Sequence, residues 1–367
     1  MSSNLPKPKT SVLLIKPYKQ GESTLMEGQK KAIALSANEG ALGASPKAFE
    51  AIAAMQEKLH KYPDGGAKAL REAIGKHYNL DPCRIVCGAG SDELISLLIQ
   101  AYAREGDEVL YSQYGFSMYR ISALAHGAVP ISVPEKNYKA DVDALLAAVN
   151  QKTKIIFLAN PNNPTGSYLN TGELLRLHTG LRRNVLLVID AAYSEYATNI
   201  PDYSQGHALT DRHENVVVTH TFSKLYGLAA LRLGWCYAPA HVIDMLNRVR
   251  GPFNVSQVAQ EAGIAALEDY EHIKQNLAIN AEEIFRVRKA LIAMGLEILP
   301  SAGNFLLLNF AQLKRKSAIE ADAYLRKKGL ILRRMDSYGL SNSLRLTIAQ
   351  RPMMDACLTA LEEYLSL

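Results

Sequence analysis

The sequence predicts an α/β protein in which a large, mostly parallel sheet carries helices on both faces and a smaller α+β domain follows it. The chain has 367 residues, which exceeds the size at which a single hydrophobic core keeps growing. Short apolar runs, several of them rich in valine and isoleucine, recur with helix-length segments between them. This alternation is typical of parallel strands that are buried on both faces.

Three segments are expected along the chain. Residues 1–40 are mixed in composition and interrupted by glycine, so we expect an arm that packs on the small domain or on a partner subunit. Residues 41–255 hold the large domain, with candidate strands at 84–87, 108–111, 154–159, 185–190 and 216–220. Residues 256–367 hold the small domain, with a helical region over 255–294, a strand over 304–309, a helix, two short strands around Ile331 and Leu344, and a final helix.

The composition argues against several classes of protein. The 41 basic and 36 acidic residues leave a net charge of +5, which is too small and dispersed for nucleic-acid binding but suits an anionic substrate. The four cysteines, Cys83, Cys87, Cys236 and Cys357, show neither metal-site spacing nor a disulfide pattern, so we expect buried free thiols in a reducing compartment and no metal. The sequence shows neither the apolar region of a secretory signal peptide nor a run of about 18 apolar residues that could span a membrane. A cytoplasmic protein without a membrane partner is expected.

Short polar sequence segments, called phrases below, follow the ends of several predicted strands. They are Gly88–Asp92, Asn160–Gly166, Asp190 with Tyr193, and Ser223–Lys224. The carboxyl ends of parallel strands meet along one edge of a sheet, where ligands gather. One ligand that touches all of these phrases would explain why they fall there.

Two of the phrases indicate recognition of charge. Gly88-Ala-Gly90 leads into a helix, whose first N–H groups can face a phosphate. It is not a dinucleotide fingerprint, because Glu93 stands where the third glycine belongs. Asp190 ends a run of five apolar residues, where a carboxylate needs a positive partner to offset its lost hydration. The alternative is an aspartate that caps the following helix.

These phrases, together with Thr221-Phe222-Ser223-Lys224 and Arg232, resemble the fold type I aminotransferases, which use pyridoxal 5′-phosphate. The likeness extends over most of the chain and is greatest to the histidinol-phosphate aminotransferase subgroup. It implies a mostly parallel seven-stranded sheet in the large domain, a smaller α+β C-terminal domain, and a homodimer with shared active sites.

The resemblance also implies a role for each residue near the cofactor ring. Lys224 is the catalytic lysine that joins the cofactor, although a lone lysine is more often a solvated surface group. Asp190 pairs with the pyridine nitrogen, unless it only caps a helix. Tyr193 and Asn163 hydrogen-bond the 3′-oxygen, with a plain turn residue as the alternative for Asn163.

A second group of residues is implied around the cofactor phosphate and ring face. Tyr62 extends from the partner subunit to the phosphate, or is simply part of a surface Tyr-Pro turn. Phe116 stacks on the ring, with Tyr114 as the alternative if the loop is shifted, or Phe116 packs in the core. The expected phosphate-binding residues are Gly90, Ser91, Thr221, Ser223 and Arg232, with Asp92 as a secondary candidate.

The substrate residues implied by the resemblance lie at both ends of the chain. Arg345 and Arg333, expected on paired strands, meet the substrate phosphate and the carboxylates of glutamate, although Arg333 could be a solvated rim residue. Tyr18 and Asn38 come from the arm. The family's usual Asn-Glu-Asn-Pro-Leu-Gly phrase is altered here to Asn-Glu-Gly-Ala-Leu-Gly at 38–43.

The implied reaction is a ping-pong transfer of an amino group from histidinol phosphate to a 2-oxo acid, expected to be 2-oxoglutarate, with Lys224 as the base. Three alternatives remain open from the sequence. They are an aromatic amino-acid aminotransferase, a decarboxylase of the phosphothreonine type, and a cofactor-binding regulator. The regulator needs a DNA-binding module, and no such segment is visible in the chain.

Overall fold

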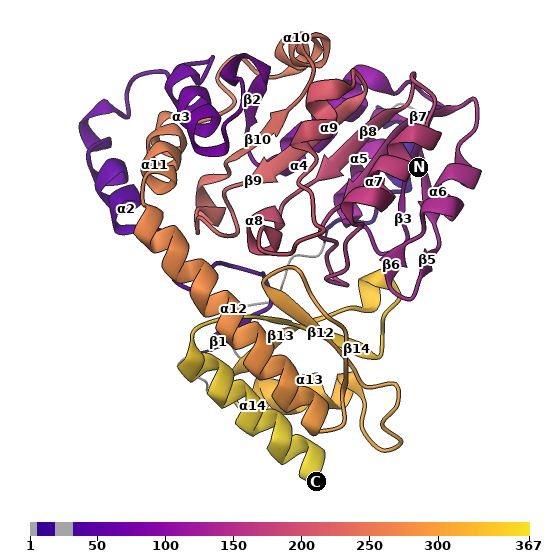
Figure 1. Cartoon of the computed structure of the whole chain (residues 1–367), viewed down its shortest axis with the longest axis vertical. Helices are drawn as coiled ribbons and strands as arrows, with labels where there is room; N and C mark the ends of the chain where they lie inside the picture. Colours follow the sequence, from indigo (N-terminus) through magenta and orange to yellow (C-terminus); the bar gives the residue numbers. More distant parts are fainter. Residues whose placement is uncertain (1–5, 19–31) are drawn as a thin grey trace.

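A seven-stranded sheet organises the larger part of the computed structural model, which describes residues 6–18 and 32–367 (Figure 1). In spatial order its strands are β2 (Ile85–Gly88), β10 (Gly234–Tyr237), β9 (Val216–Thr221), β8 (Leu186–Asp190), β7 (Thr153–Ala159), β3 (Glu108–Ser112) and β4 (Val129–Val133). Neighbours are parallel except at β10, which is antiparallel to both β2 and β9. The expected mostly parallel seven-stranded sheet is confirmed.

The sequence missed two strands of this sheet. β4 lies at an edge, contains Pro130 and leaves most of its positions partly open to solvent, so it lacks the continuous apolar character of a buried strand. β10 is short and begins with Gly234. By contrast, every residue of β8 is buried, which is why its apolar run reads clearly as a strand.

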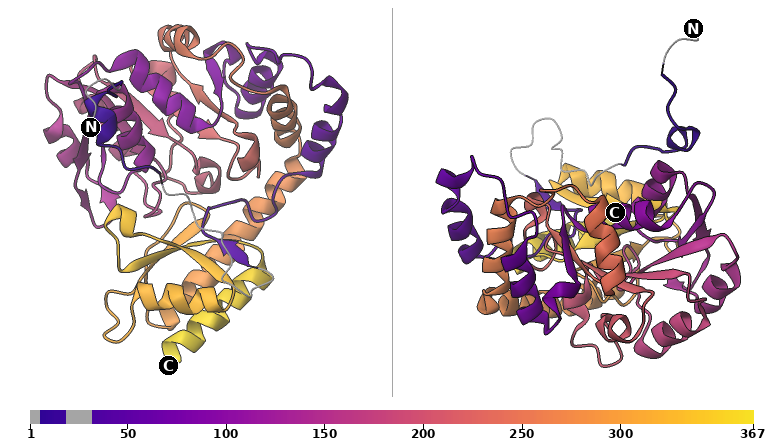
Figure 2. Two further views of the ribbon diagram at one scale, coloured as in Figure 1. Left: turned by 180° about the vertical axis from the view of Figure 1, so that it is seen from behind. Right: turned by 90° about the horizontal axis from the view of Figure 1, so that it is seen from above.

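Helices cover both faces of the large sheet (Figure 2). One face carries α4 (Ser91–Tyr102), α5 (Ser117–His126) and α10 (Ala240–Val249). The other carries α6 (Val142–Ala148), α7 (Thr171–Gly180) and α9 (His207–Arg212). At the β2 edge, α2 (Pro46–Ala53), α3 (Lys68–Tyr78) and α11 (Gln257–Leu267) form a further apolar cluster with β2 and β10.

A five-stranded sheet forms the smaller part. Its strands, in spatial order, are β1 (Ile33–Leu35), β13 (Leu330–Arg334), β14 (Ser343–Thr347), β12 (Phe305–Asn309) and β11 (Glu297–Ile298). Two helices, α13 (Ala318–Lys327) and α14 (Arg351–Ser366), pack on it. From the expected arm, β1 pairs with β13, whereas α1 (Thr10–Leu13) contacts α5. The other arm residues, 1–5 and 19–31, lie outside the described residues.

The long helix α12 (Tyr270–Ala293) connects the two parts, as Figure 1 shows. Its first half packs with the α2–α3–α11 cluster and its second half packs on the smaller sheet. The helical region expected over 255–294 consists of two helices, because the chain breaks after α11 and Asp269 caps the start of α12 by accepting from the His272 N–H. Since α11 packs with the large sheet, a domain boundary at 255/256 stays a prediction.

Two expectations from composition can be compared with the structure. Three of the cysteines are buried and unpaired, but Cys83 is exposed because it lies in the short turn before β2. For Cys83 the expectation of a buried thiol is wrong. Within residues 6–18 and 32–367, none of the helices combines the length and apolar character needed to cross a membrane.

Candidate active site

The carboxyl ends of β7, β8 and β9 open into a cavity of about 390 Å³ that the smaller sheet closes from the other side. Most of the residues proposed from the sequence line it. They are Tyr18, Ser91, Asp92, Phe116, Asn163, Asp190, Tyr193, Thr221, Ser223, Lys224, Arg232, Arg333 and Arg345. Segments far apart in the chain therefore meet at one place, as the rule for parallel sheets predicts.

Lys224 follows β9 and presents its amine to this cavity. Its Nζ donates a hydrogen bond to the Ala37 carbonyl at 2.9 Å and lies 5.7 Å from the centre of the Tyr193 ring. Burial, with the positive charge of Arg345 as the second cause, lowers the pKa of Lys224 to about 7. At neutral pH the amine is therefore often uncharged, which a nucleophile or base requires.

Asp190 lies at the end of β8 with only 5% of its surface exposed. The Tyr119 hydroxyl donates to its Oδ2 at 2.7 Å, and the Ala192 N–H donates to Oδ1 at 3.3 Å. Burial raises the pKa of the Asp190 carboxyl above its ordinary value, against the opposing effect of the Tyr119 hydroxyl. Among the described residues it has no salt-bridge partner within 4.0 Å. The site therefore favours a cationic ligand group beside Asp190.

Tyr193 connects both sides of the cavity. Its hydroxyl oxygen accepts from Asn38 Nδ2 at 3.0 Å and from Asn163 Nδ2 at 3.1 Å. Two accepted bonds leave its own hydrogen available to a third partner. Asn38 is fully buried and is not among the lining residues; its side chain also accepts from the Thr347 hydroxyl at 3.1 Å. We interpret Asn38 as a support for Tyr193.

The start of α4 and the loop after β9 bring the Arg232 guanidinium beside the N-terminus of a helix. Gly90 has a φ of +90°, which favours glycine, and a Cβ there would also displace the ends of the Asp92 and Arg232 side chains, whose Oδ1 and Nη2 atoms would lie 2.3 Å and 2.5 Å away. Arg232 Nη2 bonds Asp92 Oδ1 at 2.8 Å, and its Nη1 reaches Ser223 Oγ at 3.4 Å. The guanidinium and the helix N-terminus together suit an anion.

Four aromatic residues proposed from the sequence fall in different places. Phe116 lines the cavity, with Tyr18 edge-on to it at 6.4 Å between ring centres. Tyr114 instead stacks on Tyr138 at 5.9 Å and is not a lining residue, so Phe116 is better placed to meet a ring. Tyr62 also lies outside this chain's cavity lining; it is 83% exposed and stacks on Phe253 at 4.7 Å.

Two arginines enter the cavity from the smaller sheet. Arg333 and Arg345 are directly opposite each other on the antiparallel strands β13 and β14. Arg345 is 6% exposed, and its Nη1 donates to Asn163 Oδ1 at 2.6 Å while its Nη2 donates to the Ser36 carbonyl. Like charges facing across a sheet repel. The pair therefore favours an anionic ligand between the two sheets.

Sequence reasoning missed several residues of the site. Tyr119, which supports Asp190, is 71 residues away from it in the chain, and no local motif indicates this contact. Tyr338 lines the cavity beside Arg345 but lies in a polar turn after β13. Ser36 and Ala37 take part through backbone carbonyls, for which residue type gives no signal.

Known proteins resemble this chain over nearly its whole length. Residues 30–361 match the family model described as aminotransferase class I and II. The histidinol-phosphate aminotransferase of Rhodospirillum centenum is 50% identical over 100% of this chain and 99% of its own, and that of Rhodospirillum rubrum is 51% identical over 99% and 98%. A crystal structure of histidinol-phosphate aminotransferase from Sinorhizobium meliloti in complex with pyridoxal-5′-phosphate superposes with a TM-score of 0.85 at 29% identity, covering 92% of each chain. The chain therefore belongs to the class I and II aminotransferase family.

Proposed function

We propose that this protein is a pyridoxal-phosphate-dependent aminotransferase that moves an amino group between histidinol phosphate and 2-oxoglutarate. The observation that carries the proposal is the amine of Lys224, whose pKa is lowered to about 7, in a cavity that also holds the buried carboxyl of Asp190. Relatives about 50% identical over the full length carry the name histidinol-phosphate aminotransferase, which supports the substrate.

The donor set of the cavity fits pyridoxal phosphate. Asp190 is a buried acid with no salt-bridge partner within 4.0 Å among the described residues, which suits a protonated ring nitrogen. Tyr193 has a hydroxyl hydrogen available for the ring oxygen. Arg232 and the N-terminus of α4 suit the phosphate. Phe116 offers an aromatic face to the ring.

The chemistry divides between the cofactor and the protein. When bound, pyridoxal phosphate supplies an aldehyde that takes up amino groups and a ring that delocalises the electrons released at the substrate carbon. Lys224 first holds the cofactor and then acts as the base that takes a proton from the substrate carbon. A desolvated amine with a pKa near 7 is matched to this task at neutral pH. Asp190 keeps a positive charge on the ring nitrogen, and Tyr193 donates to the ring oxygen.

The two arginines account for the choice of substrates. Arg345 and Arg333 face each other across the smaller sheet, so a dianionic phosphate can accept from both guanidinium groups. The carboxylates of glutamate use the same pair in the second half of the ping-pong cycle. Tyr18 and Phe116 lie beside each other at the cavity and provide apolar contact for the imidazole ring of histidinol phosphate.

We further propose a homodimer in the cytoplasm. Tyr62 is exposed and lies outside its own chain's cavity lining, which is consistent with a residue that reaches the cofactor phosphate of a partner subunit. Its stacking on Phe253 holds it at the surface. No contact with nucleic acid or a membrane is part of the proposal.

Reduction of the cofactor-loaded protein with borohydride tests the role of Lys224 directly. This treatment makes the bond between cofactor and lysine permanent, so peptide mapping should find the added mass on Lys224. A Lys224→Ala protein should retain some cofactor without a covalent bond and should lose turnover. Mass on another lysine, or full activity in Lys224→Ala, would refute the assignment.

A further inference from the structure

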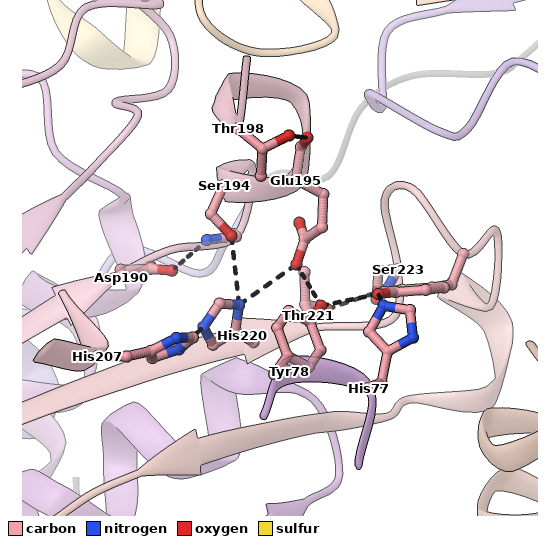
Figure 3. Close-up of polar contacts among 12 residues, drawn as sticks. His77, Tyr78, Asp190, Ser194, Glu195, Thr198, His207, His220, Thr221 and Ser223 are labelled. Carbon is pink, nitrogen blue, oxygen red and sulfur yellow. Dashed lines mark hydrogen bonds and ion pairs between the residues drawn. The ribbon is translucent and has the colours of Figure 1, made fainter. Parts of the chain in front are cut away.

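A polar array lies at the ends of β8 and β9, and none of its members lines the cavity (Figure 3). Glu195 Oε1 accepts from the Tyr78 hydroxyl at 2.8 Å and lies 3.4 Å from His220 Nδ1. On its other side, His220 Nε2 is 2.9 Å from His207 Nε2. His220 is fully buried and stacks on Trp235 at 4.2 Å between ring centres. We call Glu195, His220 and His207 the array.

The distances restrict where the protons of the array can be. His220 Nδ1 lies 3.4 Å from both Glu195 Oε1 and Ser194 Oγ, and a hydrogen on Nδ1 would avoid repulsion between an unprotonated ring nitrogen and the carboxylate oxygen. Between the two Nε2 atoms a single hydrogen is shared, because one ring must donate and the other accept. Burial, followed by the nearby His220, lowers the pKa of His207 well below its ordinary value. Each member therefore has a defined partner.

The array joins the two segments that carry the catalytic groups. Glu195 comes two residues after Tyr193, at the start of the short helix α8 (Ser194–Ala197). His220 comes directly before Thr221, near the end of β9. No member of the array is among the cavity-lining residues. Contact with substrate is thus excluded as its role, while a change in the array would shift Tyr193 relative to Lys224.

Simple packing does not account for polar groups in this position. Removing the Glu195 carboxylate and the His220 imidazole from water, and the His207 imidazole in part, costs free energy that apolar side chains of the same volume avoid. Apolar residues fill the neighbouring faces of β8 and β9. Hydrogen bonds, however, fix direction as well as distance, and this is what a catalytic geometry requires.

We propose that Glu195, His220 and His207 are positioning residues for transamination, which hold the Asp190–Tyr193 segment at a fixed orientation to the Thr221–Lys224 segment. The proposal rests on the proposed function for the reaction that is positioned. The hydrogen bonds of the array do not involve β14, the strand that carries Arg345, so the array does not position Arg345. Its loss should therefore lower kcat and cofactor affinity but leave the KM for glutamate almost unchanged.

Variants at Glu195 test this role. Glu195→Ala removes the carboxylate that accepts from Tyr78 and faces His220, and leaves the Tyr78 hydroxyl only Tyr226 and His220 Nδ1 only Ser194. We therefore expect roughly tenfold losses in kcat and in cofactor affinity of the cofactor-free protein. Glu195→Gln keeps an acceptor of the same shape and should stay within roughly threefold of the wild type in both measurements. The matched control is Glu283→Ala, which removes another buried carboxylate, paired with Arg286 on α12. It should lower thermal stability without changing cofactor affinity.

The outcomes separate the possible explanations. Wild-type kcat and cofactor affinity in a folded Glu195→Ala protein would overturn the proposal, as would equal losses in Glu195→Ala and Glu283→Ala. If Glu195→Ala does not fold, Tyr78→Phe decides, with a roughly fivefold loss of cofactor affinity expected and no loss contradicting the proposal. If the wild type lacked transamination, the proposed function would fail, and the cofactor dissociation constants would still decide the positioning role.

Discussion

Replacing Asp190 by asparagine should affect the cofactor-free and cofactor-loaded proteins in opposite directions. Asparagine keeps the shape of the side chain and an oxygen that can accept from Tyr119, which bonds Asp190 at 2.7 Å. Only the negative charge is lost. In the cofactor-free protein this charge is buried and lacks a salt-bridge partner within 4.0 Å among the described residues, whereas in the loaded protein it faces the proposed cationic ring nitrogen.

The size of the effect follows from the burial of Asp190. A hydrogen bond to a charged group at a buried site contributes about 2 to 3 kcal/mol, so Asp190→Asn should weaken cofactor binding by roughly 30- to 150-fold. Without cofactor, the negative charge of Asp190 lowers the stability of the protein. Burial raises the folded pKa of Asp190 above the unfolded value of 3.8, so the free energy of unfolding falls as pH rises between these two values. Above that interval, cofactor-free Asp190→Asn should be at least as stable as the wild type.

Two measurements check this prediction. Spectroscopic titration of the cofactor-free proteins gives the dissociation constants, and denaturant unfolding without cofactor gives the stabilities. The matched control is Asp322→Asn, because Asp322 is also buried but is paired with Arg326 in the smaller part, at 2.9 Å. It should lose stability and keep its cofactor affinity. Wild-type cofactor affinity in Asp190→Asn would refute the assignment of Asp190.

Three further predictions concern Lys224, Arg345 and Tyr62. Because burial lowers the pKa of Lys224 from 10.5 to about 7, the unfolded chain binds more protons between these values, so the cofactor-free protein should gain stability as pH rises through that range. The free energy of unfolding of Lys224→Met should lack this gain, and it should exceed that of the wild type most near or below pH 7. If the free energies of unfolding of the two proteins changed in parallel with pH, the burial of the amine would be contradicted. Arg345→Lys should raise the KM values for histidinol phosphate and glutamate by roughly 10- to 100-fold in steady-state kinetics, since lysine cannot form two parallel bonds, and unchanged KM values would exclude Arg345 from substrate binding. Refolding Tyr62→Ala together with Lys224→Ala should restore turnover through mixed dimers with one intact site, and no recovery would argue against shared sites.

Local sequence patterns predicted the parts of the site that follow buried strands. Asp190 ends one strand with an apolar run and Lys224 follows the end of another, both in a sheet covered on its two faces, so their meeting at one edge followed from the parallel order. Gly90 was identifiable because a helix start near an anion needs close backbone approach. The positions of these residues are set by segments that are close to them in the sequence.

The remaining parts depend on contacts between distant segments. Tyr119 reaches Asp190 only because α5 packs beneath β8. Asn38, expected to meet the substrate, is instead placed below Tyr193 by the pairing of β1 with the smaller sheet. The division of 255–294 into two helices is set by the Asp269 cap, which a continuous helical pattern conceals. In each case tertiary packing, and not the local preference for secondary structure, determines the position of the residue or the boundary of the helix.

The most direct test of the account is the absorption spectrum of the cofactor-loaded protein while one amino donor at a time is added without any 2-oxo acid. The account predicts that histidinol phosphate at low concentration, and glutamate at higher concentration, converts the visible band of the lysine-bound cofactor to that of its amine form. Subsequent addition of 2-oxoglutarate should restore the first band, as a ping-pong cycle requires. Conversion by phenylalanine but not by histidinol phosphate would contradict the proposed substrate, and absence of a visible band would contradict the cofactor assignment.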